Sequence, residues 1–237
     1  MNKTVLVSTL AFFLFISTPI ARAGFFDDLL GGLFSSELTL EKTITGLKEA
    51  LSIGTNNTVV KVSEINGYFK NPDIKIFMPE KIQSVADFMQ KLGYGDMVDE
   101  FILSMNQAAE KASPKARQIF LDAIMNMTFE DAKKILNGGD TAATEYLQSK
   151  TYIPISAEFT PLVSASLDEV GATRHYKNMM QMFSKVPLVT ASSFDLDHYV
   201  TTKALDGLYF MVGEEEKKIR HDPKARVTDL LKEVFDK

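Results

Sequence analysis

Apolar residues recur along most of this chain with the spacing of an amphipathic α-helix, and this pattern limits the fold more than any other feature. One set lies at i, i+4, i+7 and i+11 and so shares one helix face: Leu40, Ile44, Leu47 and Leu51. Thr39 stands where an N-cap is expected. The spacing therefore predicts a core helix from about residue 40 into the mid-50s or beyond.

The same period returns in later segments, and capping residues mark their ends. Gly93 is a C-cap, and Ser113-Pro114 supplies an N-cap and an N1 proline. Thr128 and Asp131 form a capping box, and Asp140 is placed to cap the helix that follows. Helices are predicted around residues 82–92, 97–108, 119–127, 128–137, 140–147, 162–170, 173–184, 195–212 and 222–235.

The segment around 199–213 is predicted to form the centre of the core. Its apolar residues surround most of the helix: Ala204, Leu205, Leu208, Tyr209, Phe210, Met211 and Val212. Gly207 within it costs about 1 kcal/mol relative to alanine, which suggests that another backbone approaches closely there. Asp206 is then an acid that is expected to be buried, with Lys203 as its structural partner.

Prolines and short apolar runs set the remaining boundaries. Pro154 and Pro161 are expected to precede a helix at 162–170, which Gly171 separates from the next one. Strict alternation is absent, and only 58–62 and 186–190 are candidates for strands. We therefore predict an all-α fold, a single globular multi-helix domain covering residues 39–237.

The first 23 residues have the layout of a cleavable signal peptide. Lys3 precedes the apolar stretch 5–16, Pro19 interrupts it, and Ala21 and Ala23 are the small residues that signal peptidase recognises before Gly24. The apolar stretch is shorter than the roughly 20 residues that span a bilayer, and no later segment reaches that length. We expect an exported, secreted or periplasmic protein whose mature chain has no transmembrane segment.

Charge and cysteine content exclude several classes of protein. The chain carries a net charge of −5, and removing Lys3 and Arg22 with the signal peptide lowers it to −7, the opposite of what nucleic-acid binding requires. Because the sequence contains no cysteine, disulfides, thiol catalysis and thiolate metal sites are excluded. Stability must come from the packed core alone.

The segment 24–38 is apolar on one side. Its large residues form a helical stripe opposite Asp27 and Asp28: Phe25, Phe26, Leu29, Leu30, Leu33 and Phe34. Such a stripe suits a membrane surface or a partner, but the acidic face argues against anionic lipid. We expect this segment to dock on its own domain or on a second copy.

Four segments resemble a known bacterial family. They read GLKEALSIGT at 46–55, GYFKNP at 67–72, TFEDAKKILNGGD at 128–140 and KALDGL at 203–208. Together they are similar to the exported family called domain of unknown function 4197 (DUF4197). The resemblance covers nearly the whole mature chain and implies a helical protein of the bacterial envelope. It brings no established activity and no catalytic residues.

Motifs for catalysis and cofactors are missing. The three histidines, His175, His198 and His221, show no His-x-x-x-His spacing, so no metal site is predicted. There is no nucleophile elbow, and the glycine-rich 136–140 follows a helix rather than a strand, so no cofactor is expected either. The remaining candidates for acid-base chemistry are Asp206, Asp197, His198 and Asp140, although an acid at a helix start, such as Asp197 or Asp140, is usually an N-cap.

Two classes of function stay open. Met179, Met180 and Met182 on one helix, with the N-terminal stripe, favour a non-catalytic binding protein whose partner is an apolar ligand or an envelope protein. The alternative is an envelope enzyme that uses Asp, Glu or His acid-base chemistry without a recognisable motif. A pocket where the four candidate residues converge would favour the enzyme, and an apolar groove without convergent acids would favour binding.

Overall fold

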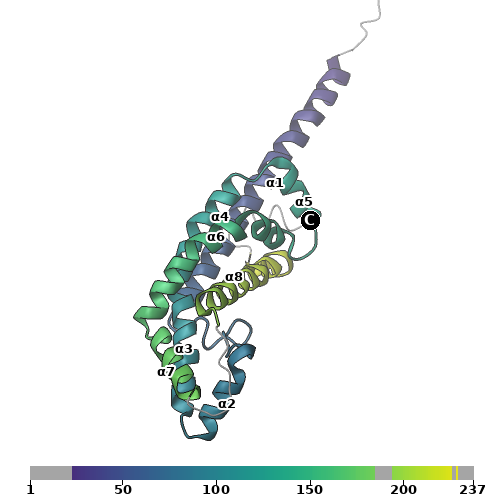
Figure 1. Ribbon diagram of the computed structural model, residues 1–237. Helices are drawn as coiled ribbons and strands as arrows, with labels where there is room; N and C mark the ends of the chain where they lie inside the picture. The colour runs from purple at the N-terminus through teal and green to yellow at the C-terminus, as the bar shows by residue number, and fades with distance from the viewer. Residues whose placement is uncertain (1–22, 185–193, 226–227, 229–237) are drawn as a thin grey trace, which may run out of the picture. The chain divides into compact units, whose positions relative to one another are not determined.

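The computed structural model describes residues 23–184, 194–225 and 228, and every regular element in this part of the chain is a helix. The chain divides into Met1–Leu40 and the compact unit Glu41–Lys237. The all-α prediction is confirmed (Figure 1). The helices are α1 (Ala23–Ser63), α2 (Gln83–Lys91), α3 (Gly95–Ala112), α4 (Ala116–Met125), α5 (Phe129–Leu136), α6 (Ala142–Glu169), α7 (Ala172–Phe183) and α8 (Leu196–His221).

Helix α1 begins earlier than its periodicity predicted, and it ends beyond the mid-50s, as the prediction allowed. Thr39 lies inside it, so the predicted N-cap is wrong, and the candidate strand 58–62 is its last full turn. Val59 and Val62 are buried while Val60 is 52% exposed, which is the three-residue period of a helix. Because no proline lies between Ala23 and Pro72, the helix continues until the turn at Asn66, where φ is +66°.

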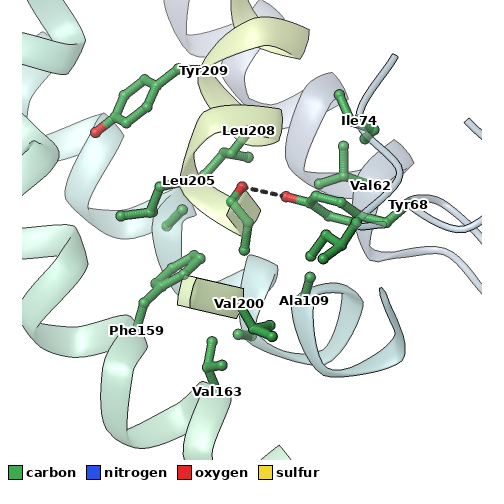
Figure 2. Packing of buried hydrophobic residues seen from close by; sticks show 14 of the residues in the cluster. Val62, Tyr68, Ile74, Ala109, Phe159, Val163, Val200, Leu205, Leu208 and Tyr209 are labelled. Carbon is green, nitrogen blue, oxygen red and sulfur yellow. Dashed lines mark hydrogen bonds between the residues drawn. The ribbon is translucent and has the colours of Figure 1, made fainter. Parts of the chain in front are cut away.

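Helix α8 lies at the centre of the core, as predicted. Leu205 and Leu208 are fully buried, and Figure 2 shows side chains from the neighbouring segments gathered around them. Helices α6 and α3 pack against α8, and Thr58 of α1 donates a hydrogen bond to the Met211 carbonyl (3.3 Å). Phe210 is the exception, since its side chain is 43% exposed rather than in the core.

Gly207 marks a close approach, although its neighbours are side chains and not the backbone that the sequence suggested. A Cβ at this position would lie 2.9 Å from the Tyr68 ring and 3.0 Å from Ile74. The Tyr68 hydroxyl donates to the Ala204 carbonyl (2.7 Å), so the ring is held against α8 (Figure 2). Burial raises the pKa of Tyr68 well above its usual value. Glycine at 207 therefore makes room for this ring.

Helix α6 runs through Pro154 and Pro161, so the predicted separate helix at 162–170 is its last part. Both prolines are exposed, as are Lys150 and Ala157, whose carbonyls lose their helical partners. Because these positions lie on the exposed side of α6, solvent is the expected partner of the freed carbonyls. The buried stripe keeps a four-residue spacing: Leu147, Thr151, Ile155, Phe159, Val163 and Leu167.

Several boundary predictions are confirmed. Gly171 has φ +80° and separates α6 from α7. Thr128 and Asp131 form a capping box at α5, and the hydrogen bond from Thr128 lowers the pKa of Asp131. Asp195 rather than Asp197 caps α8, because its carboxylate accepts from the His198 amide (2.9 Å).

Ser113 does not cap a helix. It begins a short 3₁₀ turn, Ser113–Lys115, between α3 and α4, and its hydroxyl donates to the Ala109 carbonyl (2.7 Å). Beyond α8 only a 3₁₀ turn, Pro223–Ala225, is described of the predicted last helix.

Three predictions lie outside the described residues. They are the candidate strand 186–190, most of the last helix, and the signal segment with Ala21, since the description begins at Ala23. None of the described helices combines the length and the apolar character of a membrane span.

Candidate functional site

A cleft lies between the segment 75–81 and the start of α8. It encloses about 640 Å³, and its walls combine aromatic and charged side chains. The lining residues are Lys75, Phe77, Met78, Pro79, Glu80, Lys81, Phe194, Asp195, His198, Tyr199, Thr202 and Lys203. We call it the 75–203 cleft.

An extended stretch of chain forms one wall of the 75–203 cleft. Ile76 is buried and paired by Asn106, whose amide accepts from the Ile76 N–H and donates to its carbonyl (2.8 Å each). Because successive side chains of an extended chain point to opposite sides, Lys75 and Phe77 are left on the cleft side. Phe77 is 57% exposed. A buried asparagine thus fixes the stretch that presents an aromatic ring.

Helix α8 forms the other wall. Asp195 caps its first turn, and the positions three, four, seven and eight residues later share the face that lines the cleft: His198, Tyr199, Thr202 and Lys203. The Tyr199 hydroxyl donates to the Phe77 carbonyl (3.1 Å), which joins the two walls. Burial, with a smaller contribution from Glu80, raises the pKa of Tyr199.

A row of aromatic rings connects the 75–203 cleft with the core. Phe194 lies 5.5 Å from the Tyr199 ring and 6.3 Å from the Tyr176 ring, measured between centroids. Tyr176 in turn stacks on the fully buried Phe101 at 6.0 Å. Such ring pairs stabilise their geometry beyond simple burial. The apolar side of the cleft is therefore rigidly supported.

Lysines outnumber acids in the 75–203 cleft. Lys75, Lys81 and Lys203 face only Glu80 and Asp195, and the Asp195 carboxylate already accepts from the α8 backbone. The Lys75 ammonium lies 4.1 Å from the centre of the Phe69 ring. Lys203 has only a long, exposed contact to Asp206 (3.7 Å), and Lys81 has no ion pair within the described residues.

The four predicted acid-base residues do not converge. Only His198 lines the 75–203 cleft, whereas Asp197 and Asp206 are not among its lining residues and Asp140 belongs to another cluster. The expectation that Asp206 is buried is wrong: its side chain is 52% exposed, because it lies on the solvent side of α8. Its predicted partner Lys203 is confirmed. No group of three metal-ligating side chains occurs among the described residues.

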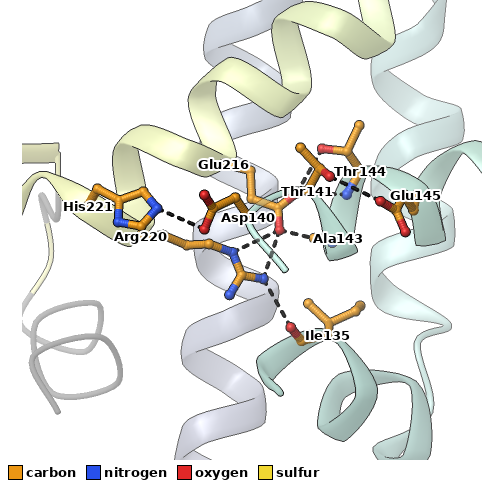
Figure 3. Close-up of polar contacts among 9 residues, drawn as sticks. All are labelled: Ile135, Asp140, Thr141, Ala143, Thr144, Glu145, Glu216, Arg220 and His221. Atoms are coloured by element: carbon orange, nitrogen blue, oxygen red, sulfur yellow. Dashed lines mark hydrogen bonds and ion pairs between the residues drawn. The ribbon is translucent and has the colours of Figure 1, made fainter. Parts of the chain in front are cut away.

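The opposite end of α8 carries a closed polar cluster (Figure 3). The Glu216 carboxylate, 5% exposed, accepts from the amides of Ala143 (2.9 Å) and Thr144 (2.8 Å) at the start of α6. It also pairs with Arg220 (2.8 Å), which donates to the Ile135 carbonyl at the end of α5. These two side chains thus join the ends of α5 and α6, a structural role that has no local sequence signal.

The contact of Glu216 with α6 also accounts for the absence of Asp140 from the N-cap of this helix. The N-cap of α6 is Thr141 and not Asp140, and it makes no side-chain capping bond because the acceptor comes from α8. Asp140 is exposed and contacts His221 at 2.8 Å instead (Figure 3). The prediction of Asp140 as a cap is therefore wrong, and the residue lies at the edge of a structural cluster.

A further set of polar contacts, centred on Glu110, stabilises the turn after α1. The buried Glu110 carboxylate accepts from the backbone amides of Asn66 (3.2 Å), Tyr68 (3.1 Å) and Phe69 (3.3 Å). Three backbone N–H groups thus donate hydrogen bonds to this one carboxylate. Glu110 is therefore a structural acid and not a reactive one.

The three methionines of α7 contact the core to different degrees. Met179 is fully buried, and Met180 and Met182 are partly buried and pack against the same core. Met179 therefore serves packing, and a groove lined by these methionines stays a prediction. The cleft residues Lys75, Phe77 and Tyr199 were missed, although the buried Ile74, Ile76 and Met78 around them show the two-residue period of an extended chain.

The comparisons agree with the resemblance of the four segments. No curated protein matches the chain significantly, and no solved structure does. The sequence profile described as "Protein of unknown function (DUF4197)" matches residues 37–236. That match covers all of the described part of Glu41–Lys237, including the 75–203 cleft and both ends of α8. The chain therefore belongs to the DUF4197 family of proteins of unknown function.

Proposed function

We propose that this protein is a non-catalytic binding protein of the bacterial envelope, and that its ligand occupies the 75–203 cleft. The observation that carries the proposal is the make-up of this cleft: three aromatic rings, of which Phe77 is exposed, lie beside three lysines, and only one of the four predicted acid-base residues, His198, lines it. Its volume of about 640 Å³ falls within the 300–1,000 Å³ typical of small-molecule sites.

The exposure of Phe77 supports this proposal. Its ring is 57% exposed although Asn106 and Tyr199 hold the adjoining backbone firmly in place. Burying such a ring against a ligand is favourable by roughly 25 cal/mol per Å² of apolar area. A ring kept exposed on a fixed backbone suits recognition, because little ordering is required on binding.

An envelope enzyme is the second candidate, and His198 is the observation that favours it. The His198 ring lines the 75–203 cleft together with Glu80, and it has no hydrogen bond within the described residues. General acid-base catalysis needs such a group within hydrogen-bond reach of the substrate. Against this candidate, the Asp195 carboxylate is engaged in capping α8, which leaves His198 without an orienting acid.

The envelope location is part of the proposal. Lys3, the apolar stretch 5–16 and the Ala21-Arg22-Ala23 sequence support export with cleavage before Gly24. Intact mass spectrometry of protein from the envelope fraction should give the mass of residues 24–237. A precursor-length mass in the soluble fraction would contradict export through a cleaved signal peptide.

Native mass spectrometry tests the binding function. Protein purified gently from the envelope should retain a small molecule, and Phe77→Ala should lose it because the ring forms one wall. Phe129→Ala is the matched control, since Phe129 is 43% exposed and lies outside the cleft. A bare wild-type protein that turns over a substrate, with turnover lost in His198→Ala, would replace binding by catalysis.

A further inference from the structure

We infer that the ligand of the 75–203 cleft is an anionic amphiphile, a molecule with a carboxylate or phosphate head on an apolar body. This inference rests on the proposed binding function and names its ligand class. The observation behind it is that three lysines border the same cleft as Phe77, Phe194 and Tyr199.

The excess of positive charge distinguishes this cleft from two others in the described part of the chain. A second cleft, of about 460 Å³ beside Ile65 and Phe210, is lined by three lysines and three acids: Lys61, Lys70, Lys218, Glu64, Asp73 and Glu214. A third, beside Tyr146, has Lys150 against Asp122 and Asp131. Since the whole chain has a net charge of −5, chance would favour acidic linings. The 75–203 cleft is the exception among these three.

The lysines are available to a ligand. The contact of Lys203 with Asp206 is long and exposed, so little energy holds it, and Lys81 has no ion pair within the described residues. Lys75 is oriented by the Phe69 ring at 4.1 Å, and a ring does not neutralise its charge. Of the two acids that line the cleft, Glu80 and Asp195, the carboxylate of Asp195 already accepts a hydrogen bond from the α8 backbone.

The aromatic side of the cleft suits the apolar body of the ligand. Phe194 and Tyr199 pack on each other at 5.5 Å and continue into the core through Tyr176, so they present a continuous apolar wall. Lysine charges beside an apolar wall interact more strongly with an anion than they would in open water, because the wall excludes solvent. Head and body are thus recognised in adjacent parts of one cleft.

Isothermal titration calorimetry with an eight-carbon series tests the ligand class. Octanoate and octyl phosphate supply the acidic head, octyltrimethylammonium reverses its charge, 1-octanol removes it, and acetate and inorganic phosphate lack the apolar body. Full mature protein, stripped of bound lipid, should bind octanoate or octyl phosphate about tenfold or more tightly than the cation or the alcohol. The two short anions should bind only weakly.

Substitutions locate the acidic head. Lys81→Gln and Lys203→Gln should each weaken the binding of octanoate or octyl phosphate roughly threefold or more, because each removes one charged contact. Lys61→Gln and Lys70→Gln are matched controls, since both lysines are exposed and line the second cleft instead. Their affinities should equal that of the wild type.

The possible outcomes separate the ligand class from the binding function. The requirement for an acidic head is overturned if 1-octanol binds as tightly as octanoate, or if both cleft lysine variants keep the wild-type affinity. The binding function stands in either case. Failure of the whole series to bind also overturns the anionic amphiphile. The binding function itself is decided by the molecule retained from the envelope and its loss in Phe77→Ala, which depends on none of these probes.

Discussion

The two ends of helix α8 use charged residues in opposite ways. At the C-terminal end, Glu216 and Arg220 are almost completely buried, and their hydrogen bonds go to the backbone of α5 and α6. At the N-terminal end, Lys203 and His198 face an open cleft beside exposed rings. Charges that are satisfied by the fold stabilise it, whereas charges left facing a cleft remain available to a ligand.

Glu216→Ala should have the largest effect on stability. It removes the buried acceptor of two α6 amides and the ion-pair partner of Arg220, which should lower the free energy of unfolding by about 3–5 kcal/mol. Glu214→Ala is the control: its carboxylate is 39% exposed and pairs with the exposed Lys217, so about 1 kcal/mol or less is expected. Urea denaturation measures both, and equal losses would contradict the structural role of Glu216.

Leu208→Ala tests the middle of the same helix. Because Leu208 is fully buried in the core, the cavity left by its side chain should cost about 2–5 kcal/mol. Phe210 lies two residues further along α8 and is 43% exposed, so Phe210→Ala should change the unfolding free energy much less. A loss below about 0.5 kcal/mol for Leu208→Ala would show that α8 is peripheral.

Alkaline pH should destabilise the protein through its buried tyrosines. Burial raises the pKa of Tyr209 from 10.0 to about 12, so the folded state stays neutral while the unfolded chain ionises. The contribution of Tyr209 to the free energy of unfolding is complete below pH 10 and is lost as the pH rises towards about 12. Chemical denaturation across this range should show a shallower decline for Tyr209→Phe, and an identical decline would contradict the assignment.

Tyr199→Phe should loosen the wall of the 75–203 cleft with a modest loss of stability. The variant removes only the hydrogen bond to the Phe77 carbonyl, which is worth about 0.5–1.5 kcal/mol. Hydrogen exchange should become faster in the segment 75–79 and stay unchanged near Glu216. Protection that is equal in both proteins would mean that Asn106 alone fixes the segment.

Lys203→Gln and Asp140→Asn should have the smallest effects on stability. Both side chains are largely exposed, and their contacts are surface ion pairs worth at most about 1 kcal/mol. Thermal unfolding should place both variants close to the wild type. A large loss for Lys203→Gln would show that this lysine belongs to the fold, as Arg220 does, and not to a ligand site.

Local sequence signals predicted a helix boundary well wherever the residues that form its cap or turn lie within one helical turn of each other in the sequence. The Thr128 capping box and the left-handed Gly171 each depend on residues within about four positions. Predictions failed where a distant segment supplied the partner or the solvent removed the penalty. Asp140 lost its capping role to Glu216, and α6 continued through Pro154 because its freed carbonyl lies on the exposed side of the helix.

The candidate site was the least predictable part, because it brings together segments far apart in the chain. His198 was identified from its acidic neighbours, whereas Lys75 and Phe77 lie more than a hundred residues away and carry no motif. Asp206 appeared buried from the apolar residues beside it. Only the rotation of α8 against α6 and the Tyr68 ring decided that this position faces solvent.

By itself, the sequence determined that the chain is helical and cysteine-free, that residues 37–236 belong to the family, and that the helix 199–213 is central. These properties follow from the 3.6-residue period of burial and from composition, which each segment carries alone. The tertiary structure decided which charged side chains are hydrogen-bonded inside the fold and which face a cleft. That choice depends on backbone donors and acceptors brought from other helices, as Glu216 and Lys203 show.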